Sequence, residues 1–297
     1  MGDRSSHSAG HRSVAVIGEF DGMHLGHRSL VDEARRVAAL SGAPLVAVVL
    51  DRAGGPQAML TDPGRRCELL LMAGVSGAVV IETPPAAGSA DQAAAIASFV
   101  RDELHADLAI MACPPATTSM RFPALRPALS RAGVEVAEVG RCVDGTGRAI
   151  TTALVAEHLA AGRVKEVAEL LGRPHAVSGV VEIGDQRGRT IGFPTANVPL
   201  DHVQVWPALG VYAAWVTVDG VRHRAAVNIG VRPTIYGDHG APLLEAHFLD
   251  FEGDLYGKVI TIALVEKLRD EQRFDGLGAL MAQLALDVEA TRRTLVD

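Results

Sequence analysis

The segment Gly192-Phe193-Pro194-Thr195-Ala196-Asn197 is the most informative stretch of this sequence, because it concentrates loop-forming and oxygen-donating residues. Pro194 fixes its own φ angle and disfavours a helical conformation at Phe193, so an extended segment is expected. Thr195 and Asn197 then direct a hydroxyl and an amide oxygen to the same side, which are hard ligands suited to Mg²⁺. Because glycine, proline and asparagine are also common in turns, a hairpin loop fits the segment alone equally well.

The composition limits the class of protein. With 297 residues, the chain is long enough for roughly two domains of about 150 residues each. Its formal charge is −7, from 28 basic and 35 acidic side chains, and it contains no long basic run. We therefore expect nucleotides as anionic partners, and neither a nucleic acid polymer nor a membrane surface.

Cysteines and apolar runs bear on the compartment. Cys67, Cys113 and Cys142 show neither CxxC nor Cys/His spacing, so no disulfide framework and no zinc site are expected. No apolar run approaches the roughly 18 residues of a membrane span, and residues 1–12 lack the apolar core of a signal peptide. The sequence predicts a soluble cytoplasmic protein with a disordered tail, and it does not specify an oligomeric state.

The first half of the chain alternates short apolar runs with helical stretches rich in alanine and leucine. Strands are expected at residues 15–17, 45–50, 79–81, 108–111 and 134–139, and helices at 29–40, 62–73, 91–104 and 123–132. This βαβα order is typical of a parallel, Rossmann-like α/β sheet covered by helices on both faces.

The pattern of apolar residues changes after Leu171, where Gly172-Arg173-Pro174 ends the last helix. Strands joined by Gly, Asp and Pro turns are then expected at residues 177–183, 210–218, 222–229, 243–250 and 259–265, followed by a closing helix at 275–295. This pattern predicts a small antiparallel barrel or sandwich. We expect a domain at 13–171 and a second at 172–297.

A carboxylate lies on the polar side of one of these strands. Period-two alternation places Leu244, Ala246 and Phe248 on one face, and Glu245 with His247 on the other. Since glutamate is mostly exposed in proteins, alternation alone favours a solvent-facing Glu245 over a catalytic one.

Several motifs follow one another in the second half: 188–197, Gly210-Val211-Tyr212, 228–234, Glu245-Ala246-His247, Asp254-Leu255-Tyr256-Gly257 and Leu268-Arg269-Asp270-Glu271. Over about residues 171–295, their order and spacing closely resemble the riboflavin kinase module of bacterial bifunctional riboflavin kinase/FAD synthetases. The resemblance implies a six-stranded barrel that transfers the γ-phosphoryl group of ATP to the 5′-hydroxyl of riboflavin, giving FMN.

The resemblance also implies a role for individual residues. Thr195 and Asn197 would hold Mg²⁺ against the ATP phosphates, and Glu245 would accept the proton of the ribityl hydroxyl. For Asp254 and Tyr256 we prefer a turn between strands. The remaining expected contacts are Gly184, Gly188, Arg189, Gly192, Phe193 and Pro194 for ATP, and Arg269 and Phe274 for the flavin.

The run from Gly18 to His27, GEFDGMHLGH, follows a strand and precedes a helix, which is where open α/β sheets bind nucleotides. It resembles the HxGH signature of nucleotidyltransferases, in the FDGxHxGH form of FMN adenylyltransferase modules. The alternative is a glycine-rich turn that happens to carry two histidines. The nucleotide site that the resemblance implies consists of Gly18, Phe20, Asp21, Gly22, His24, Gly26 and His27.

Other adenylyltransferase signatures are altered. Residues 50–55 replace a Phe-Asp-Pro-His-Pro-like segment, residues 112–118 replace a Gly-x-Asp/Asn-Phe-x-Phe-Gly loop, and Glu19 stands where asparagine is common. Ala156 ends the stretch 150–156 where the family has an arginine that contacts the nucleotide phosphates. We therefore predict a riboflavin kinase whose FAD synthetase activity is weak or absent on a retained fold.

Two alternatives stay open. The first is a fully bifunctional enzyme that uses His24 and His27 to convert FMN into FAD. The second is a flavin-binding regulatory protein that performs little chemistry, which is disfavoured because Thr195, Asn197 and Glu245 are all present.

Overall fold

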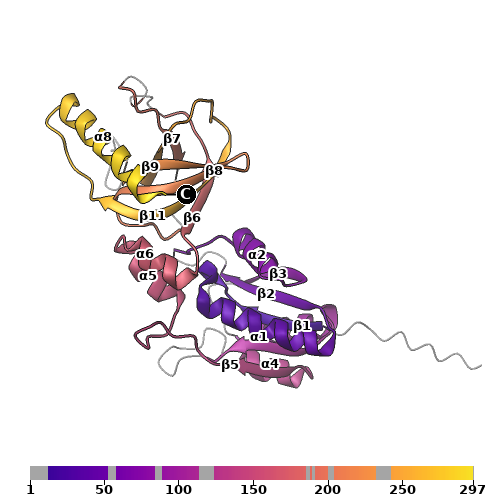
Figure 1. Cartoon of the computed structure of the whole chain (residues 1–297). Coiled ribbons are helices and arrows are strands. Elements are labelled where there is room, and N and C mark those ends of the chain that lie inside the picture. The colour runs from indigo at the N-terminus through magenta and orange to yellow at the C-terminus, as the bar shows by residue number, and fades with distance from the viewer. Residues whose placement is uncertain are drawn as a thin grey trace, which may run out of the picture. The chain divides into compact units, whose positions relative to one another are not determined.

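The computed structural model describes residues 13–52, 58–83, 89–113, 124–184, 188, 191–199, 204–231 and 242–296. The chain forms two compact units, 1–57 with 61–151 and 58–60 with 152–297 (Figure 1). Two helices before the predicted domain boundary, α5 (Thr152–Ala160) and α6 (Val164–Leu171), group with the second unit. The boundary at residues 171/172 stays a prediction about the two functional modules, and the predicted tail at 1–12 lies outside the described residues.

The first unit contains a five-stranded parallel sheet in the order β3-β2-β1-β4-β5. The strands are β1 (Ser13–Gly18), β2 (Leu45–Arg52), β3 (Gly77–Thr83), β4 (Ala106–Ala112) and β5 (Glu135–Val139). Because β1 pairs with β2 on one side and with β4 on the other, the strand order reverses at β1. Ligands of open α/β sheets bind at such a switch point, beyond the carboxyl ends of the strands.

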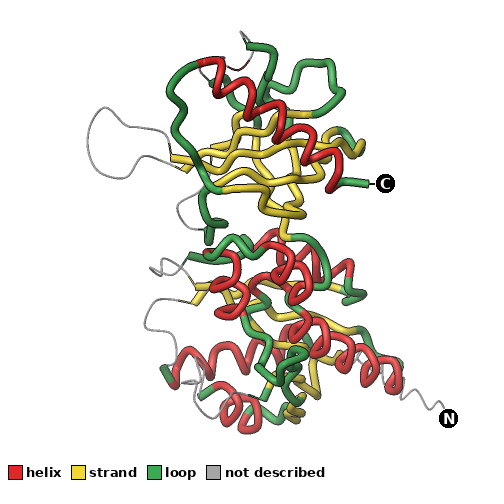
Figure 2. The backbone as a smooth tube through the Cα atoms, turned by 60° about the vertical axis from the view of Figure 1, so that its left-hand side comes forward, coloured by secondary structure: helices red, strands yellow, loops and turns green. Residues whose placement is uncertain are grey.

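Helices cover both faces of this sheet (Figure 2). Alternate residues of β1 enter two separate apolar clusters: Val16 packs with residues of α1 and α2, and Ile17 packs with residues of α3 and α4. These helices are α1 (Leu25–Ser41), α2 (Pro63–Met72), α3 (Ala90–Ser98), extended by a π-helical turn over Phe99–Glu103, and α4 (Leu125–Arg131). The predicted α/β architecture is confirmed.

The second unit contains a six-stranded antiparallel sheet in the order β6-β11-β8-β9-β10-β7. Its strands are β6 (His175–Val180), β7 (Ala196–Pro199), β8 (Gly210–Val218), β9 (Val221–Val231), β10 (Pro242–Phe248) and β11 (Val259–Arg269). The sheet curls until its edges meet, where Glu182 N donates to Asn197 O at 2.8 Å. Helix α8 (Leu277–Thr294) packs along β8, β9 and β11 (Figures 1 and 2), so the predicted barrel with a closing helix is confirmed.

Several element boundaries differ from those expected, and the differences at α1 and β7 have a clear physical reason. Helix α1 begins at Leu25 rather than Ser29, because the side chain of His24 caps it by accepting a hydrogen bond from His27 N. Strand β7 was expected only as an extended segment, and it is four residues long and ends at a proline. Such a short edge strand carries too little alternation to be recognised from its sequence.

Candidate functional site

A row of polar side chains crosses the outer strands of the second unit. In the β10 ladders, Glu245 lies opposite Asn197 of β7 on one side and opposite Asn228 of β9 on the other. Directly opposed residues of an antiparallel pair project from the same face, so the strand register alone brings these three side chains together. Asn228 Nδ2 is 3.5 Å from Glu245 Oε2, and Asn197 is buried.

Glycines close the backbone tightly around this row. A Cβ atom added at Gly184 would lie 2.4 Å from Asn197 Nδ2, and one added at Gly188 would lie 2.3 Å from Phe193 O. Gly192 adopts a φ of 84°, which favours glycine. Gly184 and Gly188 of the predicted glycine loop therefore pack against residues 193–197 so closely that no side chain fits between them, and we call this arrangement the cradle around Asn197. Arg189 of the same loop lies outside the described residues.

His247 supports the same segment from β10. Its Nδ1 is 2.9 Å from Pro194 O, and its ring makes an edge contact with Phe193 at a centroid distance of 5.3 Å. Alternation correctly placed His247 on the face of Glu245, and the buried Leu244 and Ala246 occupy the other face. The contact of His247 with Pro194 could not be predicted from the sequence, because it depends on the pairing of β7 with β10.

Two cavities meet at Thr195. One, of about 550 Å³, is lined by Thr195 and Asn197 together with Phe251 and Tyr256. The other, of about 610 Å³, is lined by Thr195 and Glu245 together with apolar residues of α8. We call the first the Asn197 cavity and the second the Glu245 cavity. Thr195 is therefore a residue that a group bound in either cavity can contact.

The turn after β10 belongs to the Asn197 cavity. Tyr256 N donates to Asp254 Oδ1 at 2.9 Å, which closes the turn that the sequence predicts at these residues. Both residues also line the cavity. Their structural role and their place beside a ligand are therefore compatible.

The two expected flavin contacts, Arg269 and Phe274, both line the Glu245 cavity. The Arg269 guanidinium carbon is 5.8 Å from the centroid of the Phe274 ring. Arg269 is also held by Asp287 of α8, a residue that sequence reasoning missed.

In the first unit, the predicted nucleotide loop begins directly after β1. Phe20 and Met23 have φ angles of 52° and 42°, and Gly22 has a φ of 78°. Positive φ is strained for residues other than glycine and persists only where the surroundings enforce it. Thr61 supplies part of that constraint, since Asp21 Oδ1 accepts from Thr61 N at 2.9 Å and Thr61 Oγ1 accepts from Gly22 N at 2.9 Å.

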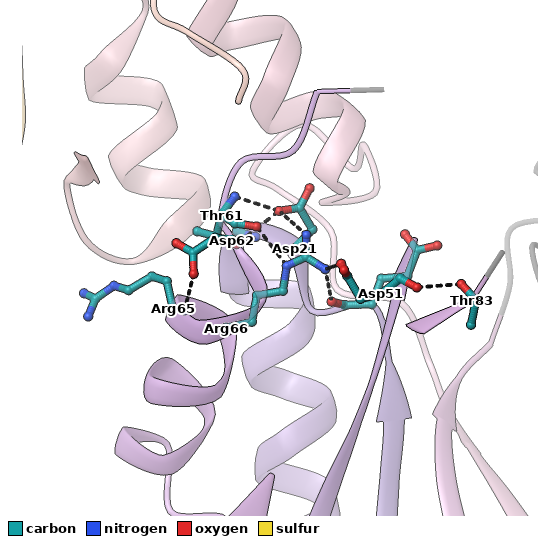
Figure 3. A network of polar contacts seen from close by, with 9 residues as sticks. Asp21, Asp51, Thr61, Asp62, Arg65, Arg66 and Thr83 are labelled. Carbon is teal, nitrogen blue, oxygen red and sulfur yellow. Dashed lines mark hydrogen bonds and ion pairs between the residues drawn. The ribbon is translucent and has the colours of Figure 1, made fainter. Parts of the chain in front are cut away.

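A buried arginine completes the constraint, as Figure 3 shows. Arg66 of α2 is only 2% exposed, and its Nη1 donates to Asp51 Oδ1 at 2.9 Å and to Glu19 O at 3.3 Å. Its Nη2 lies 3.6 Å from Asp21 Oδ1. One guanidinium thus ties β2 and the loop after β1 to α2, through two buried carboxylates.

The two histidines of the loop stack on each other, with ring centroids 3.7 Å apart. Burial lowers the pKa of His24 to about 4. Burial, and then the nearby charges of His24 and Arg66, lower the pKa of His27 well below its ordinary value. Both imidazoles are therefore neutral near pH 7. A Cβ atom added at Gly26 would lie 3.0 Å from the His24 ring, which is tighter than an ordinary contact, so this position favours glycine.

The structure describes only part of the segments in which the adenylyltransferase signatures are altered. Residues 53–55 and 114–118 lie outside the described part of the chain, whereas Asp51 belongs to the Arg66 network and Ala156 lies on α5. Gly18 precedes the loop, and a Cβ atom added there would lie 3.2 Å from the Phe20 ring.

Comparisons with known proteins agree with both halves of this description. The family model for riboflavin kinase matches residues 171–295, and the model for FAD synthetase matches residues 6–112. Bifunctional riboflavin kinase/FMN adenylyltransferases from Escherichia coli K12 and Pseudomonas fluorescens are 37% and 34% identical to this chain. Each alignment spans 94% of the chain, and 91% and 92% of those relatives.

A crystal structure described as a macrolide-efflux protein from Streptococcus pneumoniae has a TM-score of 0.79 and 27% identity, and the match covers 95% of this chain and 94% of that one. None of the helices in the described part of this chain combines the length and apolar character needed to cross a bilayer. With both family models matched in order and relatives aligned over nearly its full length, the chain belongs to the bifunctional riboflavin kinase/FMN adenylyltransferase family of enzymes.

Proposed function

We propose that the second unit phosphorylates riboflavin at the junction of the Asn197 and Glu245 cavities. ATP would occupy the Asn197 cavity and riboflavin the Glu245 cavity, so that the γ-phosphorus and the 5′-hydroxyl meet beside Thr195. The observation that carries this proposal is the register of β7, β10 and β9, which aligns Asn197, Glu245 and Asn228 on one face.

Glu245 is the group suited to deprotonate the substrate. It would accept the proton of the 5′-hydroxyl while that oxygen attacks the γ-phosphorus, and the bond from the γ-phosphorus to the bridging oxygen would break to release ADP. Asn228 would orient the Glu245 carboxylate, since its Nδ2 is 3.5 Å from Oε2. The products are FMN and ADP, and the proton rests on Glu245 until solvent removes it.

The donor set at Thr195 and Asn197 fits Mg²⁺. A hydroxyl and an amide oxygen are hard ligands, and phosphate oxygens and water would complete the six positions of this ion. The space for it depends on glycine, because a Cβ atom at Gly184 would lie 2.8 Å from Asn197 Oδ1. When bound, the ion would neutralise charge on the phosphates.

The test is to incubate the protein with riboflavin, ATP and Mg²⁺ and to separate FMN from FAD by chromatography. FMN production that falls sharply in Glu245→Gln, with riboflavin binding unchanged, supports the assignment. Bound but unconverted riboflavin would instead indicate the flavin-binding regulatory protein, and an active Glu245→Gln variant would remove this residue from the mechanism.

We further propose that the nucleotidyltransferase-like module, residues 13–171, makes FAD only weakly. Transfer of the adenylyl group of ATP to FMN requires donors for the phosphate oxygens, which the N–H groups of His24 and His27 can supply. His27 Nδ1 is buried and has no hydrogen-bond partner in the described part of the chain, so it has a hydrogen bond still to make, although the loop would have to open for a phosphate oxygen to reach it. Ala156, however, supplies no charge where the family uses arginine.

The same incubation, repeated with FMN in place of riboflavin, measures this second activity as FAD and pyrophosphate. A rate of FAD synthesis far below the rate of FMN synthesis is expected. Comparable rates would favour the fully bifunctional enzyme and would contradict the reduced activity proposed here.

A further inference from the structure

Helix α8 carries a buried carboxylate that faces the barrel. Asp287 is 4% exposed, and both of its oxygens bind Arg269: Nε is 2.9 Å from Oδ1, and Nη2 is 2.8 Å from Oδ2. Gln283 Nε2 also donates to Oδ1 at 2.9 Å. A two-point contact of this kind fixes the plane of the guanidinium group as well as its position.

The third guanidinium nitrogen is also engaged. Arg269 Nη1 donates to Asp270 O at 3.0 Å. An arginine has five N–H donors, and these contacts use three of them. Within the described part of the chain, one N–H on each terminal nitrogen is therefore available to a ligand in the Glu245 cavity, which Arg269 and Asp287 both line.

The ion pair is poorly explained by stability alone. Removing two charges from water costs about as much as their attraction returns, so buried pairs are often replaceable by apolar residues without loss of stability. A pair placed in the wall of a cavity has another use. It presents N–H donors in a fixed direction while adding no net charge, which suits an uncharged aromatic ring that carries carbonyl oxygens.

We propose that Asp287 is a positioning residue for flavin binding. Resting on the riboflavin kinase function proposed above, the inference is that Asp287 holds the Arg269 guanidinium so that it donates to carbonyl oxygens of the flavin ring. Asp287 thereby sets the affinity for the flavin, whereas it takes no part in ATP binding or in the transfer of the phosphoryl group.

The test is the variant Asp287→Asn, which keeps the size of the side chain but leaves one acceptor oxygen for two guanidinium donors. The Kd for riboflavin, measured by equilibrium dialysis, is expected to rise at least tenfold. The KM for ATP and the kcat at saturating riboflavin are expected to stay within about twofold of wild type. Dialysis needs no turnover, so a protein that binds riboflavin without phosphorylating it still tests this inference separately from the proposed function.

The chain offers a second ion pair on the same helix as a control, and this pair is exposed whereas that of Asp287 is buried. Arg292 of α8 makes an equally close two-point contact with Asp250, at 2.6 Å for each pair of atoms, and Asp250 lines neither cavity. The variant Asp250→Asn weakens an ion pair that holds α8 and leaves the contacts of Arg269 intact. It is expected to leave the Kd for riboflavin unchanged.

Three results would overturn the inference. They are unchanged riboflavin affinity in Asp287→Asn, equal loss of affinity in Asp250→Asn, and a parallel decline of kcat, ATP binding and melting temperature that marks a purely structural role. If Asp287→Asn does not fold, Arg269→Lys still allows the proposal to be refuted, since it keeps the charge but cannot form the two-point contact. A riboflavin Kd at the wild-type value in Arg269→Lys would equally refute the proposal.

Discussion

Substituting alanine for Gly184 tests the cradle around Asn197. Gly184 does not have a positive φ, so alanine imposes no backbone strain there. The added Cβ atom, however, would lie 2.4 Å from Asn197 Nδ2 and 2.6 Å from its Cγ, whereas ordinary contact begins at 3.4 Å. Because the added atom would clash with both Nδ2 and Cγ of the short Asn197 side chain, the carboxamide group has to move by about 1 Å.

A displacement of this size is enough to disable phosphoryl transfer. Misplacing a reacting or ligating group by about 1 Å costs on the order of a hundredfold in rate. We therefore expect kcat/KM for ATP to fall about a hundredfold in Gly184→Ala. The Kd for riboflavin should stay within about twofold, because Asn197 and Gly184 do not line the Glu245 cavity.

The assay follows FMN formation at varied concentrations of ATP and Mg²⁺, and equilibrium dialysis measures riboflavin binding. Gly278→Ala is the control, because a Cβ atom there meets no atom within 4 Å and its position in α8 favours alanine. Full activity in Gly184→Ala would show that Asn197 need not occupy its present position, and the reasoning from the cradle would be refuted.

Three further predictions concern single side chains. Glu245→Gln should lower kcat about a hundredfold or more and leave riboflavin binding unchanged, as measured by FMN formation and dialysis. Arg66→Met should destabilise the first unit by about 3–5 kcal/mol, since it leaves the buried carboxylates of Asp21 and Asp51 without their cation; urea unfolding measures the loss, and a loss below about 1 kcal/mol would contradict it. Because folding lowers the pKa of His24 from its ordinary 6.5 to about 4, its contribution to stability is complete above pH 6.5 and is lost as the pH falls towards 4. Melting temperatures at pH 7 and pH 5 should therefore differ less in His24→Gln than in wild type, and an equal difference would exclude this contribution.

Much of the fold could be predicted because its signals are local. The inner strands of the first unit are nearly continuous apolar runs such as that of β2, which only a sheet covered on both faces can bury. In β10, alternation correctly separated Leu244 from Glu245. Strand β7 was expected as an extended segment but not as a paired strand, since its pairing depends on partners more than 40 residues away in β10.

The parts of the candidate sites that escaped prediction are those that depend on contacts distant in sequence. Arg66 precedes Leu69 and Leu70 on α2, and its own burial is visible only when Asp21 and Asp51 are brought to it. Asp287 likewise occupies a position of α8 that the pattern of apolar residues does not distinguish from solvent-exposed ones. A charged side chain in a helix is ordinarily exposed, so its burial becomes predictable only once its partner is known.

The Arg66 network and the strained loop carry different information about the first unit. Removing Arg66 would cost a large share of the 5–15 kcal/mol that keeps a typical domain folded, so a unit without catalytic activity would need this residue as well. The positive φ angles at Phe20 and Met23 contribute nothing to folding and cost roughly 1–2 kcal/mol each. Strain of this kind is usually stored where a site needs it, and here it directs the chain into the His24–His27 pair. The strained loop therefore favours a weak adenylyltransferase over a unit that has lost the activity altogether.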